Sequence, residues 1–114
     1  MLLLLLSGLP AASREDPAAG LHAGTSLYLH GRFAVAAVSL KRFLGTPGAT
    51  PGPREAQAAY FLGRTFQELG LRGLALHYLG RAESAAGWRV AALREIARAY
   101  LQVGEPQPVL DALA

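Results

Sequence analysis

The segment from Tyr60 to Ala82, YFLGRTFQELGLRGLALHYLGRA, most constrains how this chain can fold. Its first half repeats apolar residues at helical spacing, and a second helical pattern starts after a short turn marked by Gly70 and Gly73. Two helices joined by so short a turn have to lie antiparallel. The small residues Gly63 and Ala75 permit close approach of the two backbones, so we expect them to face each other where the helices cross.

The same pattern recurs on both sides of this segment at fixed offsets in the numbering. Adding 34 leads from Leu79 to Leu113, and subtracting 39 leads from Leu79 to Leu40. The difference between the two offsets falls in one place, the segment 45–53. The matched positions are Ala23, Gly24, Leu27, Gly31, Ala36 and Leu40; Leu62, Gly63, Phe66, Gly70, Ala75 and Leu79; and Ile96, Ala97, Tyr100, Gly104, Val109 and Leu113.

A helix–turn–helix unit with a period of 34 resembles the tetratricopeptide repeat (TPR). The middle unit differs from the family pattern at four positions: Ala59 stands for Trp, Phe66 for Tyr, Leu79 for Phe, and Gly87 for the Pro that closes the unit. The resemblance implies an all-α, TPR-like right-handed α-solenoid of about three units, residues 17–44, 54–87 and 88–114, the last of them incomplete. It also implies that the first helices of successive units line a concave groove, in which such proteins hold a peptide or a protein segment.

The N-terminal segment 1–13, MLLLLLSGLPAAS, is predicted to be a signal peptide because small residues that permit cleavage follow an apolar run. The run is short and no Lys or Arg precedes it, so a misassigned start or a truncated leader is the alternative. Pro10 and Arg14 come too early for a transmembrane helix, which needs about 20 apolar residues. Residues 14–16 are then a linker. A functional leader predicts a secreted or periplasmic protein of the bacterial envelope; without one the protein is expected in the cytoplasm.

The sequence GTPGATPGP at residues 45–53 cannot continue a helix, because it contains three Pro and three Gly. It is either a mobile binding loop or an insertion between two units, and we favour the insertion because lengthening a surface loop costs little free energy. Pro53 is well placed at the first position of the next helix.

The last apolar pattern, residues 108–113, is too short for the second helix of a unit, and its apolar face has no expected cover. Solenoids usually end in a polar capping helix. Either the chain is a fragment of a longer array, or this edge packs on a partner or on a second copy. A homo-oligomer formed through the C-terminal edge is therefore one expectation.

No pattern in the sequence predicts catalysis or a cofactor. The chain has no Cys, and its serines lack the G-x-S-x-G context of a nucleophile elbow. His22 and His30 are two helical turns apart, too far to chelate one metal ion. The glycine-rich segment lacks the Lys of a phosphate-binding loop. We therefore expect a protein that is not an enzyme, with no catalytic residues, no metal site and no cofactor.

Charge does not indicate a nucleic-acid partner. The formal net charge is +3, from 11 Lys and Arg against 8 Asp and Glu, and these residues are scattered along the chain. A nucleic-acid-binding domain normally concentrates its basic residues on one face. The expected partner is therefore a protein or a peptide.

The candidate binding residues lie at matched places on the first helices of two units. Arg64 and Arg98 are separated by one full repeat, so their guanidinium groups should project side by side into one groove. Such a pair, with aromatic neighbours, suits an extended acidic or C-terminal peptide segment. The predicted groove residues are Tyr60, Phe61, Arg64, Arg94 and Arg98.

An alternative interpretation is that both arginines pair with Glu68, Glu95 or Glu55 and only solvate the surface. The terminal-carboxylate clamp that some proteins of this family use includes Asn, and this chain has none, so that clamp is not expected here. Three further aromatic residues are assigned to the hairpin core rather than to ligand stacking: Phe66, Trp88 and Tyr100.

The function expected from these patterns is that of a non-catalytic scaffold or adaptor for protein–protein interaction. Two alternatives stay open. One is a regulatory or substrate-presenting repeat domain of a larger enzyme or of a secretion or envelope assembly. The other is a structural module that associates with itself.

Overall fold

The structure is a computed structural model that describes residues 19–45 and 52–102. Within these ranges the chain is all-α, with five helices and no strand. The helices are α2 (Ala19–Leu29), α3 (Phe33–Leu44), α4 (Pro53–Glu68), α5 (Arg72–Glu83) and α6 (Ala86–Gln102). The predicted leader, the linker, most of the loop at 45–53 and the pattern at 108–113 lie outside the described residues.

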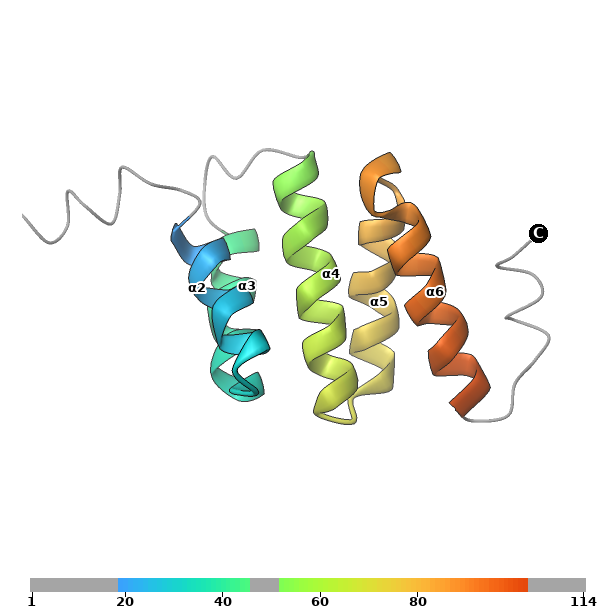
Figure 1. The fold of residues 1–114 in the computed structure, drawn as a ribbon, viewed down its shortest axis with the longest axis horizontal. Coiled ribbons are helices and arrows are strands. Elements are labelled where there is room, and N and C mark those ends of the chain that lie inside the picture. The colour runs from blue at the N-terminus through green and yellow to red at the C-terminus, as the bar shows by residue number, and fades with distance from the viewer. Residues whose placement is uncertain (1–18, 46–51, 103–114) are drawn as a thin grey trace, which may run out of the picture.

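Each helix packs against the next one along the chain, and α4 also contacts both α2 and α6. Figure 1 shows that α2, α4 and α6 run in one direction while α3 and α5 run in the opposite direction. The predicted antiparallel hairpin is therefore α4–α5, and α2–α3 forms a second one. No helix in the described ranges is both long enough and apolar enough to cross a membrane.

Both hairpins turn in the same way. Gly31 and Gly70, which occupy matched positions of the repeat, each have φ of +77°, in the left-handed region that favours glycine. In the first turn the N–H of Arg32 donates to the carbonyl of Leu27 at 2.9 Å. In the second, the N–H of Leu71 donates at 2.8 Å to the carbonyl of Phe66, the residue that the repeat matches to Leu27. This is the bond pattern of a Schellman motif, so the two turns are structural equivalents, as the sequence offset predicts.

The helices of each hairpin cross at a glycine. A Cβ placed on Gly63 would lie 2.7 Å from Cγ of Leu79 and 3.1 Å from the carbonyl oxygen of Ala75. The predicted close approach of Gly63 and Ala75 is confirmed. In the first hairpin a Cβ on Gly24 would lie 2.5 Å from Cγ of Leu40. The absence of a side chain is thus required at equivalent places in both hairpins.

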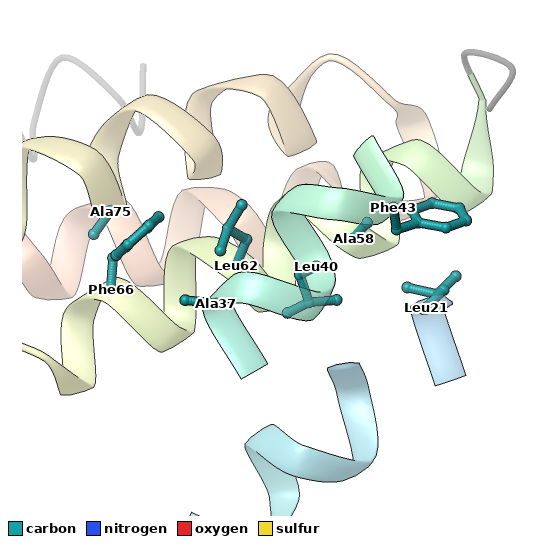
Figure 2. Packing of buried hydrophobic residues seen from close by; sticks show 8 residues of the cluster. All are labelled: Leu21, Ala37, Leu40, Phe43, Ala58, Leu62, Phe66 and Ala75. Atoms are coloured by element: carbon teal, nitrogen blue, oxygen red, sulfur yellow. The ribbon is translucent and has the colours of Figure 1, made fainter. Parts of the chain in front are cut away.

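Two apolar clusters meet on α4. The first joins α2, α3, α4 and α5, and Figure 2 shows its members, including Leu40, Leu62 and Phe66, pointing into one interior. The second joins α4 and α5 to α6 through Leu79 and Ile96. Helix α4 is therefore the centre of the described structure. The prediction of Phe66 as a core residue is confirmed.

Two glycines differ from their predicted roles. Gly73 and Gly87 were expected to interrupt helices, but they lie inside the first turns of α5 and α6. A helical glycine costs only about 1 kcal/mol relative to alanine, which the packing of the rest of the helix can offset. Helix α3 ends before Gly45, as expected from the helix-breaking segment 45–53, and Gly45 has φ of −90°.

Candidate binding face of α2, α4 and α6

A row of aromatic rings crosses the three helices that run in the same direction. The ring of Tyr28 on α2 lies 5.6 Å from that of Phe61 on α4, and Phe61 lies 6.1 Å from Trp88 on α6. Phe33, at the start of α3, extends the row at 5.6 Å from Tyr28. The rings meet at steep angles, an arrangement that aromatic pairs prefer. All four side chains are partly accessible, so the row is a surface feature and also part of the packing.

One aromatic residue lies differently from the prediction. Tyr60 was expected on the groove wall, but it is only 9% exposed because its ring packs 5.1 Å from Trp88 and joins the second apolar cluster. Trp88 was assigned to the hairpin core; it is partly buried against the second apolar cluster, and it also ends the aromatic row. Tyr100 is also half-buried, with the Arg72 guanidinium 4.9 Å from its ring centre.

A buried carboxylate joins Arg64 and Arg98. Oε1 of Glu95 lies 3.5 Å from Nε of Arg64, and its Oε2 lies 3.3 Å from Nη1 of Arg98. The Glu95 side chain is 6% exposed, against 25% for Arg64 and 54% for Arg98. The two arginines are brought together as predicted, but Glu95 compensates one of their two positive charges. Both arginines therefore pair with Glu95, one of the three carboxylates of the alternative interpretation. Glu55, another of the three, pairs instead with Arg81 at 2.7 Å.

Further contacts fix Arg64 in place. Its Nη1 donates a hydrogen bond of 3.0 Å to the Tyr60 hydroxyl, and its guanidinium lies 5.7 Å from the centre of the Tyr28 ring. Burial acts to lower the pKa of Arg64, but the Tyr60 hydroxyl and the Glu95 carboxylate outweigh it, so the pKa is raised. For Tyr28 burial acts in the opposite direction, because the charged form of a phenol is the deprotonated one, and it raises the pKa. Arg64 therefore stays charged and Tyr28 stays a neutral phenol at physiological pH.

Beside these ion pairs lies a polar pocket of about 220 Å³. Gln67 on its wall donates from Nε2 to the backbone carbonyl of Glu95 at 3.4 Å, which adds a second link between α4 and α6. The lining residues are Arg64, Gln67, Glu68, Glu95, Arg98 and Gln102. The pocket offers guanidinium and amide N–H donors together with carboxylate acceptors, the groups that pair with peptide backbone and polar side chains.

The remaining predicted groove residue, Arg94, is exposed on α6, next to the buried Glu95. The helical period alone could not show that Glu95 points inward, because its matched residue in the middle unit is the aromatic Phe61. The one available signal was the spacing of Glu95 and Arg98, which places a carboxylate and a guanidinium one turn apart on a helix.

In the described ranges, no three His, Cys, Asp or Glu side chains lie close enough together to hold a metal ion. His30 instead forms a 2.7 Å hydrogen bond from Nδ1 to the backbone carbonyl of Ser26 within its own helix end.

These features describe an all-α module with an aromatic row and a charged pocket on one face. Comparison of the chain with protein-family models, with curated proteins and with solved structures finds no match in any of the three.

Proposed function

We propose that the chain is a non-catalytic protein-interaction module of the TPR-like solenoid type. Its ligand is an extended peptide or protein segment held on the face of α2, α4 and α6. The observation that carries this proposal is the continuity of Tyr28, Phe61 and Trp88, one ring from each of the helices α2, α4 and α6. The bacterial envelope is the proposed location, supported by the apolar and small-residue sequence of residues 1–13.

The aromatic row supports binding of apolar side chains. Partly exposed rings provide a rigid surface that loses little conformational entropy when a ligand covers it, and such residues dominate the energetics of many interfaces. Rings from three helices give a surface longer than a single-residue pocket, which suits a segment in extended conformation.

The charged pocket supports recognition of one polar or anionic group beside the apolar part of the ligand. Arg64, Glu95 and Arg98 together have a net charge of +1, because the carboxylate offsets one of the two guanidinium groups. Arg98 is more than half exposed and is the most accessible member of the group for a ligand. Its planar guanidinium can form paired hydrogen bonds with a carboxylate.

Trp88 provides a direct test, since it is the sole tryptophan of the chain and lies at the end of the row. Peptides would be selected from a random display library on the full-length protein and then titrated against it while Trp88 emission is recorded. We expect a saturable change in emission intensity or wavelength.

Two matched variants locate the ligand. Phe61→Leu keeps an apolar side chain but removes the central ring, and should weaken binding about tenfold, a loss of about 1.4 kcal/mol. Val38→Ala alters an exposed residue of α3, in the other helix layer, and should leave binding unchanged. Circular dichroism would check that both variants fold. Equal affinity of the selected peptides for both variants would place the binding site elsewhere.

A further inference from the structure

Helix α6 has an apolar face that the described residues leave open. Val90, Leu93, Ala97 and Leu101 recur at helical spacing along one side of the helix. Val90 is 68% exposed and Leu101 is 58% exposed, while Leu93 and Ala97 are partly buried. Large apolar side chains that gather along one helix face, rather than singly, mark a surface that something covers.

The corresponding face of α4 is covered. The repeat matches Val90, Leu93 and Ala97 to Ala56, Ala59 and Gly63, and these three residues of α4 are all buried. Helix α5 covers Gly63 with Leu79 and with the backbone of Ala75. Helix α3 covers the equivalent Gly24 with Leu40. In both complete hairpins, the segment that follows the first helix closes this face.

We propose that residues 106–114 of the same chain cover α6 as α5 covers α4, with Val109 and Leu113 packed on Leu93 and Ala97. These residues lie outside the described ranges, and the proposal does not depend on the proposed function. It assigns the open face of α6 to an intramolecular contact, not to a partner protein.

The spacing along the chain supports this assignment. Ala75 and Leu79 follow the last residue of α4, Glu68, by 7 and 11 positions, and Val109 and Leu113 follow Gln102, the last residue of α6, by the same numbers. Gly104 lies where the two observed turns have Gly31 and Gly70, both with φ of +77°. The chain therefore has the turn residue and both apolar side chains at the required positions.

A tethered segment also has an advantage over a second copy. A segment joined by a short linker has an effective concentration on the order of millimolar, well above the concentration of a second molecule in dilute solution. Ala97 has a methyl group where Gly24 and Gly63 have none, so the covering segment should lie slightly farther from α6 than α5 lies from α4.

Because the chain has no cysteine, introduced pairs test this arrangement without background. The full-length variant Ala97→Cys with Val109→Cys would be oxidised at low protein concentration and analysed by non-reducing electrophoresis and mass spectrometry. We expect a monomer with one internal disulfide. The control is Arg98→Cys with Val109→Cys: its first cysteine is one residue closer along the chain but about 100° away around the helix.

The rates of internal disulfide formation in the two variants decide the question. A rate at least about tenfold higher for the Ala97 pair than for the Arg98 pair supports the docked segment. Equal rates in the two pairs overturn it, because a segment that only samples positions joins either cysteine. A disulfide-linked dimer also overturns it and assigns the face to a second copy.

A second measurement covers the case in which a disulfide distorts the fold. The single variant Ala97→Cys would be labelled with a thiol reagent, with and without the additional change Leu113→Asp. Docking predicts that Leu113→Asp accelerates labelling by about tenfold or more, since a buried carboxylate opposes the contact. An unchanged labelling rate contradicts the proposal.

Discussion

Leu79 occupies the space that a side chain on Gly63 would need. Its Cγ would lie 2.7 Å from a Cβ at that position, closer than such atoms approach in folded proteins. Leu40 stands in the same relation to Gly24, the matched glycine of the first hairpin. The repeat in the sequence thus corresponds to a repeated packing contact between a glycine of the first helix and a leucine of the second. This contact determines how closely the two helices of a hairpin approach.

Gly63→Ala should therefore destabilise the protein although alanine is the better helix former. Overpacking costs about 1–3 kcal/mol, and the gain in helix propensity offsets up to about 1 kcal/mol of that cost. The net loss expected in urea unfolding is about 0–2 kcal/mol. Gly80→Ala is the matched control: an added Cβ meets nothing within 4 Å there, so the same change should stabilise by about 0.5–1 kcal/mol. If both variants are equally stabilised, the close contact is absent.

A separate prediction concerns the hairpin turns, where replacing the glycine strains the backbone but causes no steric clash. A Cβ at Gly70 would meet no atom within 4 Å, yet its φ of +77° disfavours any other residue. Gly70→Ala should destabilise by about 1–2 kcal/mol, and Gly70→Asn by less, since Asn adopts this conformation more readily. Gly73 lies in the first turn of α5, where an added Cβ meets nothing within 4 Å, so Gly73→Ala should instead stabilise the protein. Thermal melts of the three variants would show this order; a melt of Gly70→Ala at or above the wild-type temperature contradicts the turn geometry.

Glu95 should contribute more to stability than Glu55, although its distances to Arg64 and Arg98 are longer than the distance between Glu55 and Arg81. Glu95→Gln keeps the shape of the side chain but leaves the two arginines without their carboxylate, at an expected cost of about 1–3 kcal/mol. Glu55→Gln breaks the shorter 2.7 Å pair with Arg81, but both of those side chains are more exposed, so its cost should be about 0–1 kcal/mol. Urea unfolding of both variants in low salt would compare them. A larger loss for Glu55→Gln would show that burial does not govern these pairs.

The hairpin fold could be predicted from the sequence because its determinants are local and repeated. Glycines at matched offsets predicted the turns at Gly31 and Gly70 and the approach of Gly63 to Ala75, and the structure contains all three features. A tight turn and a helix crossing each require particular small residues, and such residues are readable from one sequence.

The details of the candidate face could not be predicted in this way. The helical period places Phe61 and Glu95 at the same angle, yet Phe61 is partly exposed and Glu95 is buried. A carboxylate turns inward only where guanidinium groups from two helices compensate for its lost hydration. That depends on how α4 and α6 pack together. Tyr60 is buried for a similar reason, because Trp88 of the neighbouring helix lies against it.

The final prediction separates the two arginines, which the sequence alone treated as equivalent. Arg64 is three-quarters buried and contacts the Tyr60 hydroxyl as well as Glu95, so Arg64→Gln should lower stability by about 1–2 kcal/mol. Arg98 is more than half exposed, and Arg98→Gln should change stability by less than about 0.5 kcal/mol.

Binding should depend more on Arg98 than on Arg64, because the Arg98 guanidinium is the more exposed of the two. With peptides selected on the wild-type protein and Trp88 emission as the readout, Arg98→Gln should weaken binding of peptides that contain a carboxylate and reduce the dependence of their affinity on salt. Peptides without a carboxylate should bind the variant as they bind the wild type. Arg94→Gln, an exposed change on the same helix, controls for the loss of one positive charge. If Arg98→Gln and Arg94→Gln have the same effect on affinity and salt dependence, Arg98 only solvates the surface and does not contact the ligand.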